Sequence, residues 1–154
     1  MKMLKPFVMG MVTMLALACG DQHFFEKNVA IPNRSWNYSE MPKFEVAITD
    51  NKATYDIWIN VRNTGEYNYA NLFLLVHENG PKLRDTAFRY ELKLAEVDGR
   101  WTGKSAGSLY ENQLLLKENF SFPDTGKYTF AVEQNMRENP LRDITDIGIK
   151  IKKR

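Results

Sequence analysis

One cysteine, two histidines and one glycine-flanked loop are the features of this 154-residue chain that could support catalysis or bind a metal or a phosphate. Neither His23 nor His77 has the spacing of a metal site or a catalytic triad. The stretch from Gly99 to Ser105 has three residues between its glycines, where a phosphate-binding loop needs four, and no helical pattern follows it. We therefore predict a non-enzymatic protein with no catalytic residue, no metal site and no cofactor. A periplasmic hydrolase with clustered acids stays open as an alternative.

The cysteine points instead to lipidation. Basic Lys2 and Lys5 precede an uncharged stretch from Phe7 to Ala18, which has the pattern of a secretory signal. At about 12 residues this stretch is shorter than the roughly 20 that span a bilayer. Its end, Leu15-Ala16-Leu17-Ala18-Cys19, resembles a bacterial lipobox. We predict a lipoprotein signal peptide over residues 1–18, a lipidated Cys19 and an acylated tether over residues 19–28.

Charge argues against one class of partner. Without the predicted signal peptide, 19 basic side chains face 19 acidic ones, so the net side-chain charge is zero. Nucleic-acid binding depends on a basic surface that neutralises phosphates. We therefore expect no nucleic-acid partner, and a protein that is held to a membrane by its lipid without crossing it.

The rest of the chain has the period-two alternation of β-strands. Residues 72–76 are continuously apolar, which predicts a strand buried on both faces. Residues 110–118 fit a strand, with a helix as the alternative. Seven or eight short strands predict an all-β fold: a single antiparallel β-sandwich, immunoglobulin-like or jelly-roll-like, over residues 29–154. The candidate strands are residues 44–48, 55–61, 72–76, 88–94, 110–118, 128–132 and 146–151, with a weaker one at 29–31.

Aromatic residues carry two further expectations. Tyr128 follows a turn at Asp124 with the spacing of a tyrosine corner, a structural feature of sandwiches. Trp58 occupies the outward phase of its strand, while Tyr67 and Trp101 lie near turns. Exposed rings can stack on sugars or anchor a protein interface. A carbohydrate-binding envelope lipoprotein that uses Trp58, Tyr67 and Trp101 is therefore an alternative function.

Four stretches of the chain carry a family resemblance: residues 31–36, 55–75, 122–137 and 141–151. The most specific part runs from Glu133-Gln134-Asn135-Met136-Arg137 to Asp146-Ile147-Gly148. Together these stretches resemble the gliding-motility lipoprotein GldH family of Bacteroidetes. The resemblance implies an envelope lipoprotein needed for gliding, which works beside other motility and type IX secretion proteins and has no catalytic residues. We expect it to face the periplasm rather than the cell surface.

The segment from Glu133 to Asp143 is too polar for a core, and Pro140 argues against a continuing strand. We predict a loop or single helical turn that docks onto a motility partner. The competing account is structural: Met136 and Leu141 cap the sandwich, and Arg137 pairs with Asp143 or Asp146. The candidate interface residues are Gln134, Met136, Arg137 and Leu141, with Trp58.

A modification site is also predicted. Asp85-Thr86-Ala87 resembles the acceptor motif for O-glycosylation of exported Bacteroidetes proteins. The motif precedes a predicted strand, so we expect the Thr86 hydroxyl to be exposed. An ordinary turn threonine is the alternative.

Overall fold

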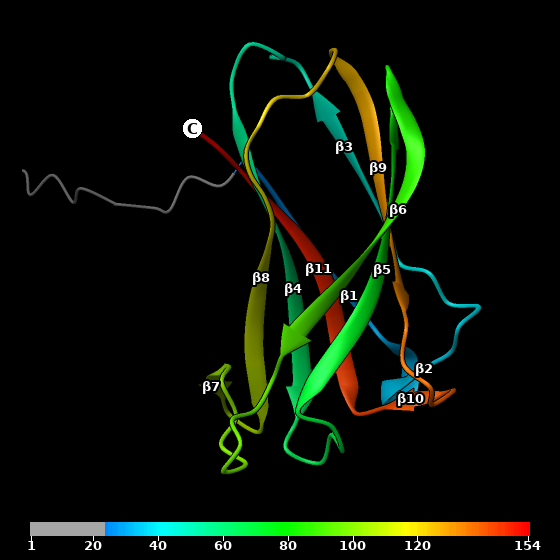
Figure 1. The fold of residues 1–154 in the computed structure, drawn as a ribbon, viewed down its shortest axis with the longest axis vertical. Coiled ribbons are helices and arrows are strands. Elements are labelled where there is room, and N and C mark those ends of the chain that lie inside the picture. The colour runs from blue at the N-terminus through cyan, green and yellow to red at the C-terminus, as the bar shows by residue number, and fades with distance from the viewer. Residues whose placement is uncertain (1–23) are drawn as a thin grey trace, which may run out of the picture.

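The computed structural model describes residues 24–154, and it consists of two antiparallel sheets packed face to face (Figure 1). The first sheet has the strand order β1-β11-β4-β8-β7, and the second has the order β3-β9-β5-β6. This confirms the predicted all-β sandwich. The strands of the first sheet are β1 (Phe25–Ala30), β4 (Tyr55–Thr64), β7 (Lys104–Ala106), β8 (Leu109–Phe120) and β11 (Ile144–Lys153); those of the second are β3 (Lys43–Ile48), β5 (Asn71–Gly80), β6 (Leu83–Lys93) and β9 (Gly126–Gln134).

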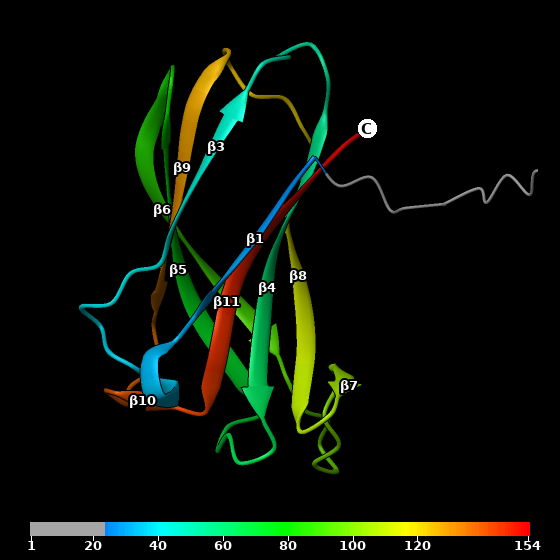
Figure 2. The same cartoon turned by 180° about the vertical axis from the view of Figure 1, so that it is seen from behind.

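A smaller element closes one end of the sandwich. Strands β2 (Ser35–Trp36) and β10 (Leu141–Arg142) pair with each other, and the 3-10 helix η1 (Pro32–Arg34) leads into β2. Trp36 is fully buried here, and its Nε1 donates a hydrogen bond to the Glu40 carbonyl at 2.7 Å. The chain enters β1 at the opposite end, beside the C-terminal residue (Figure 2).

The core lies between the sheets and is built by the predicted alternation. Each fully buried aliphatic or aromatic side chain contributes about 1.5–3 kcal/mol relative to exposure. Residues 110–118 belong to β8, so the helical alternative is wrong. The central buried side chains are Phe44, Val46 and Ile48 on β3; Tyr55, Ile57, Ile59 and Val61 on β4; Leu72, Leu74 and Val76 on β5; Tyr128, Phe130 and Val132 on β9; and Ile147, Ile149 and Ile151 on β11.

Strand β5 is buried on one face only, which corrects the expectation for residues 72–76. Phe73 and Leu75 point to the outer face of the second sheet and are half-buried. The sandwich has only two layers, so no element covers this face. The guanidinium of Arg89 shields Phe73 instead, 3.9 Å from the ring centroid. A continuous apolar run therefore does not require burial on both sides.

One strand boundary and one side chain also differ from expectation. Strand β1 begins at Phe25, inside the segment assigned to the tether, because Phe25 to Ala30 pair with Ile151 to Asp146 of β11. Phe88 shares its phase with Tyr90 and Leu92 but is 42% exposed. It lies on edge strand β6, and the facing β8 brings Lys117 within 5.2 Å of its ring instead of an apolar group.

The tyrosine corner is confirmed. The Tyr128 hydroxyl lies 2.8 Å from the Asp124 carbonyl and accepts a hydrogen bond from the Asp124 amide at 3.2 Å. It also lies 3.1 Å from the Pro81 carbonyl, so it ties together two turns. A Cβ at Gly80 would lie 2.2 Å from the Tyr128 ring, so only glycine allows this approach.

Candidate functional site

The segment after β9 forms a loop over residues 135–140, which is shorter than the predicted loop or turn over Glu133 to Asp143, because β9 continues to Gln134 and Leu141 and Arg142 form β10. Gln134, the last residue of β9, is fully buried and holds the loop closed. Its Oε1 accepts a hydrogen bond from the Met136 amide at 2.9 Å, and its Nε2 donates one to the Glu138 carbonyl at 3.0 Å. A buried side-chain amide with both ends used in this way fixes the loop backbone.

Tyr38 braces the same loop from outside. Its hydroxyl donates a hydrogen bond to the Met136 carbonyl at 2.7 Å, and its backbone amide donates one to Asn139 Oδ1 at 2.9 Å. The ring remains 40% exposed. Tyr69 lies beside Glu138, to whose Oε2 its hydroxyl donates at 2.7 Å, and this hydrogen bond raises the pKa of Tyr69. Both exposed rings therefore have fixed positions.

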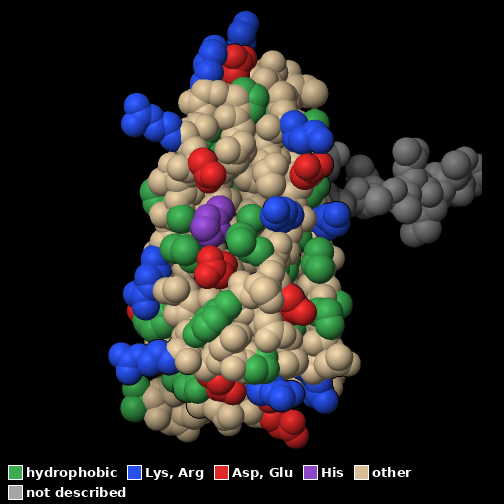
Figure 3. All heavy atoms as spheres, turned by 90° about the vertical axis from the view of Figure 1, so that its right-hand side faces the viewer, with side chains coloured by type: hydrophobic (Ala, Val, Ile, Leu, Met, Phe, Trp, Pro, Cys, Tyr) green, Lys and Arg blue, Asp and Glu red, His purple; other side chains and the backbone are tan. Residues whose placement is uncertain are grey.

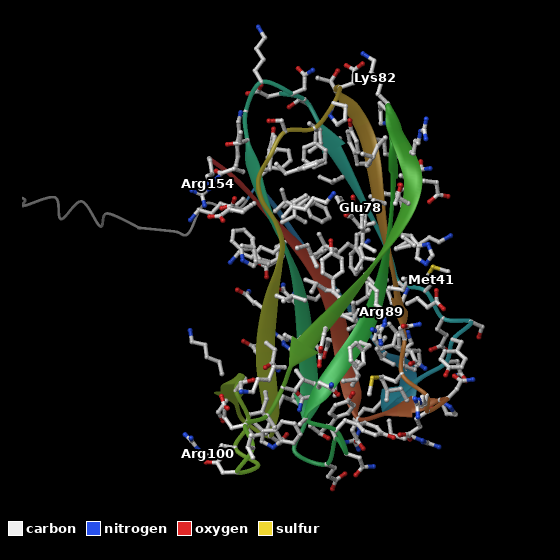
Figure 4. The ribbon with its side chains drawn as sticks, in the orientation of Figure 1. Met41, Glu78, Lys82, Arg89, Arg100 and Arg154 are labelled. Atoms are coloured by element: carbon white, nitrogen blue, oxygen red, sulfur yellow. The ribbon has the colours of Figure 1, made fainter. Side chains whose placement is uncertain are left out.

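A third group of contacts joins the loop to the outer face of the second sheet. Asn135 Oδ1 accepts a hydrogen bond from Arg89 Nε at 2.9 Å, while the Arg89 guanidinium stacks on Phe73. Met136 packs against the core, and its Sδ accepts from the Phe73 amide at 3.3 Å. Arg89 and Met41 lie on the same side of the molecule in Figure 4.

These contacts define a surface that we call the loop platform. One of its residues, Arg137, is exposed, and within residues 24–154 its side chain makes no hydrogen bond or ion pair. Exposed aromatic rings, methionine and arginine on a fixed backbone are the composition that protein interfaces favour. The loop platform consists of Tyr38, Tyr69, Phe73, Arg89, Met136 and Arg137.

A shallow hollow of about 310 Å³ extends this face away from the loop platform. Met41, Lys43 and Ala131 are among its lining residues, with His77 of β5. His77 Nε2 lies 3.2 Å from Glu133 Oε2. Figure 3 shows apolar side chains gathered around the histidine on this face.

The predicted interface residues are divided by the fold. Arg137 is exposed and Met136 is half-buried, but Gln134 and Leu141 are fully buried and offer nothing to a partner. Trp58 lies on β4 of the other sheet, so it does not join them. The structural account is also correct only in part. Met136 and Leu141 do pack against the core, but Arg34, not Arg137, lies 3.9 Å from Asp143.

Other sequence candidates are placed as follows. Thr86 is exposed on β6, and its hydroxyl donates to the Arg84 carbonyl at 2.9 Å. Tyr67 is buried and Trp101 packs on Tyr110, so Trp58, Tyr67 and Trp101 do not form one stacking surface. Cys19 and His23 lie outside the described residues.

The sequence did not reveal Tyr38, Tyr69 or Arg89 as members of the site. Tyr38 and Met136 are 98 residues apart in the chain, and Arg89 and Asn135 are 46 apart. No local spacing encodes such contacts. The sequence shows only an isolated tyrosine in a polar turn, and this pattern is compatible with many roles.

Comparison with known proteins gives the family. The profile described as GldH lipoprotein matches residues 23–151. The chain belongs to the GldH lipoprotein family. Among its relatives, a gliding motility lipoprotein GldH homolog of Christiangramia forsetii is 30% identical, with 96% of this chain and 94% of the relative covered. Gliding motility lipoprotein GldH of Flavobacterium johnsoniae is 25% identical, with 94% and 93% covered.

The GldH match runs from the start of β1 into β11, so it includes the whole loop platform. A solved family GH115 4-O-methyl-α-glucuronidase is 10% identical, with a TM-score of 0.43, and the similarity covers 94% of this chain and 19% of the enzyme. That similarity is too weak to support any inference. Within residues 24–154 of this GldH protein, no three His, Cys, Asp or Glu side chains are grouped to hold a metal ion. The same residues contain no helix with the length and apolarity to cross a bilayer.

Proposed function

We propose that this GldH-family protein is a non-enzymatic component of the gliding machinery, held in the cell envelope by a lipid on Cys19. It acts with other motility or type IX secretion proteins, and it faces the periplasm. The names of its relatives support the gliding role and the lipid. The observation that supports a docking role is the loop platform, where Arg137 stands exposed above a loop that Gln134 holds from within.

The loop of the platform, between β9 and β10, lies at the end of the sandwich away from the point where the chain enters β1 (Figure 1). A lipid before that point would therefore place the platform on the side facing away from the membrane, where another envelope protein can reach it. The fixed backbone reduces the conformational entropy that docking would cost. Met136 and Tyr38 supply apolar area, and Arg137 supplies a charge without an internal partner.

The Arg137→Ala substitution tests this role. Because Arg137 has no side-chain partner within the described residues, its removal should leave the thermal midpoint within about 1 °C, as for surface substitutions in general. Gliding should be lost or strongly reduced. Arg84→Ala is the matched control, because Arg84 is also exposed but lies on β6, outside the loop. Cells that carry this variant should glide normally.

Two outcomes would contradict the proposal. In the first, Arg137→Ala cells glide like the wild type. In the second, the variant melts several degrees earlier and its cellular level falls in step with motility, which would make Arg137 a structural residue. If neither outcome is found, a photo-crosslinker at position 137, compared with one at position 84, should identify the docked partner.

A further inference from the structure

A row of hydrogen-bonded amides crosses the outer face of the first sheet. Asn60 of β4 lies at its centre, and its Nδ2 donates to Glu26 Oε1 at 2.8 Å and to Asn28 Oδ1 at 3.2 Å, both on β1. Its Oδ1 accepts from Gln113 Nε2 of β8 at 3.0 Å. The row therefore joins side chains of three strands and passes over a fourth, β11.

Gly148 makes this crossing possible. It is the β11 residue that pairs with both Asn28 and Asn60. A Cβ at position 148 would lie 1.8 Å from Asn28 Oδ1, so any other residue would separate the two amides. Glycine weakens a strand, and its presence here marks a close approach of side chains. The amides therefore lie flat on the sheet in fixed positions.

Trp58 continues the row along β4. It is two residues before Asn60, on the same face, and lies between Lys150 of β11 and Leu115 of β8. Its ring is half-buried and Leu115 is 41% exposed, so both present apolar surface beside the amides. An indole ring next to fixed hydrogen-bonding groups offers a stacking surface with polar contacts at its edge.

Three hollows follow this face. Trp58 lines one of about 350 Å³, Asn60 lines a second of about 60 Å³, and Gln113 lines a third of about 720 Å³. The second and third share Glu111 and Gln113, so they adjoin each other, whereas the hollow at Trp58 is a separate one farther along β4.

Charge and hydrogen-bonding capacity indicate the kind of ligand. Arg62 pairs with Glu111 at 2.6 Å, and Lys153 and Arg154 pair with Asp50 and Asp56 at 2.7 Å, so several of the charged side chains along the hollows are already paired. Asn28 uses only its oxygen and Gln113 only its nitrogen within the described residues. One amide nitrogen and one amide oxygen thus remain for a ligand that both donates and accepts. A hydroxyl group does both.

We propose that the outer face of the first sheet binds a neutral oligosaccharide. A sugar ring stacks on Trp58, and sugar hydroxyls accept from Asn28 Nδ2 and donate to Gln113 Oε1. This site lies on the opposite sheet from the loop platform and does not depend on the docking role.

Calorimetric titration of the full lipidated protein tests the proposal. The protein is kept in a detergent without a sugar headgroup, which would otherwise compete. The probes are a soluble chitooligosaccharide, a β-glucan and a mannan, so that a cell-wall-type glycan is distinguished from other neutral glycans. We expect at least one to bind, and Trp58→Ala to weaken that binding at least about tenfold, the loss expected for one good ring contact.

Gln113→Ala should also weaken binding severalfold, and it provides a test if Trp58→Ala fails to fold, because Gln113 is exposed and its side chain hydrogen-bonds only Asn60 among the described residues. Tyr69→Ala, which removes an exposed ring from the other sheet, should bind like the wild type. The proposal is overturned if the wild-type protein binds none of the three probes. It is equally overturned if folded Trp58→Ala and Gln113→Ala variants bind as tightly as Tyr69→Ala.

Discussion

Glu78 of β5 and Lys117 of β8 form an ion pair between the two sheets, with Oε2 and Nζ 2.6 Å apart. Glu78 is 2% exposed, and its Oε1 has no hydrogen-bond partner among the described residues (Figure 4). The Lys117 ammonium also lies 4.4 Å from the centroid of the Phe120 ring. The sandwich thus carries a paired charge among core side chains that are mostly apolar.

Removing one partner of this pair should cost more than removing both. Lys117→Met leaves a buried carboxylate unpaired and should lower the free energy of unfolding by about 3 kcal/mol or more. The double variant Glu78→Leu with Lys117→Met should be near the wild type or more stable. Urea denaturation of the three proteins measures both effects, and an unchanged midpoint for Lys117→Met would show that the pair contributes little.

The buried amide of Gln134 should matter for stability rather than for docking. Gln134→Leu leaves the Met136 amide and the Glu138 carbonyl without their partner, which should cost about 1–3 kcal/mol. Limited proteolysis should then cut within residues 135–140. Gln113→Leu, at an exposed position, should change stability by less than about 0.5 kcal/mol. Equal losses in both variants would contradict the role of Gln134.

Asp56 should make the protein sensitive to acid. Burial alone would raise its pKa, but the Asn119 amide and Arg154 Nε donate hydrogen bonds to it, and the net effect lowers the pKa below its ordinary 3.8. A carboxyl group with a lowered folded-state pKa stabilises the fold above its unfolded pKa, and this is lost as the pH falls through the folded value. Stability should therefore decline below about pH 4.

The Asp56→Asn variant isolates this contribution. It should be less stable than the wild type at pH 7 and should lose less of its remaining stability between pH 5 and pH 3, ranges set by ordinary carboxyl values. Denaturation midpoints across that range provide the measurement. Parallel curves for the two proteins would assign the acid sensitivity to other carboxylates, such as Asp50, whose pKa is lowered by its hydrogen bond to Lys153.

Cys19 should determine whether the protein stays with a membrane. Each buried methylene of an acyl chain contributes about 0.8 kcal/mol, so a multiply acylated residue holds its protein stably. Cys19→Ser should move the protein to the soluble fraction of the periplasm. Fractionation after a high-salt wash measures this, and retention of the variant in membranes would contradict lipid anchoring.

Thr86 should carry a glycan when the protein is made in its native host. Its exposure on edge strand β6 leaves room for the modification. The intact mass of the Thr86→Ala variant should be lower than that of the wild type by more than the difference between the two side chains, because the variant also lacks the glycan. A mass change equal to the side-chain difference alone would make Thr86 an ordinary strand threonine.

The sequence predicted the parts of the fold that local patterns encode. Alternation located the core residues of β3, β4 and β9, and the spacing from Asp124 to Tyr128 predicted the tyrosine corner correctly. Burial of a whole strand face was less predictable. Phe73 looked like core but lies outside, because the layer that would cover it does not exist.

The candidate site was predicted only where its residues lie in one continuous segment of the sequence. The loop after β9 and exposed Arg137 followed from polarity and Pro140, whereas buried Gln134 did not, because a polar residue at a strand end is usually solvated. Tyr38 and Arg89 reach the loop through pairings that only the folded chain creates. Glu78 gave no signal for the same reason, since its partner lies on the other sheet.

The antiparallel pairing of β1 with β11 has a mechanical consequence. The chain enters β1 at Phe25, at one end of the β1–β11 ladder. The loop of the platform continues through β10 into β11, which begins at Ile144, beyond the other end of that ladder. Tension between a lipid anchor and a partner at the platform would pull the two strands in opposite directions along their lengths. The hydrogen bonds from Phe25 to Ala30 would then carry the load together, in shear, instead of breaking one after another from an end.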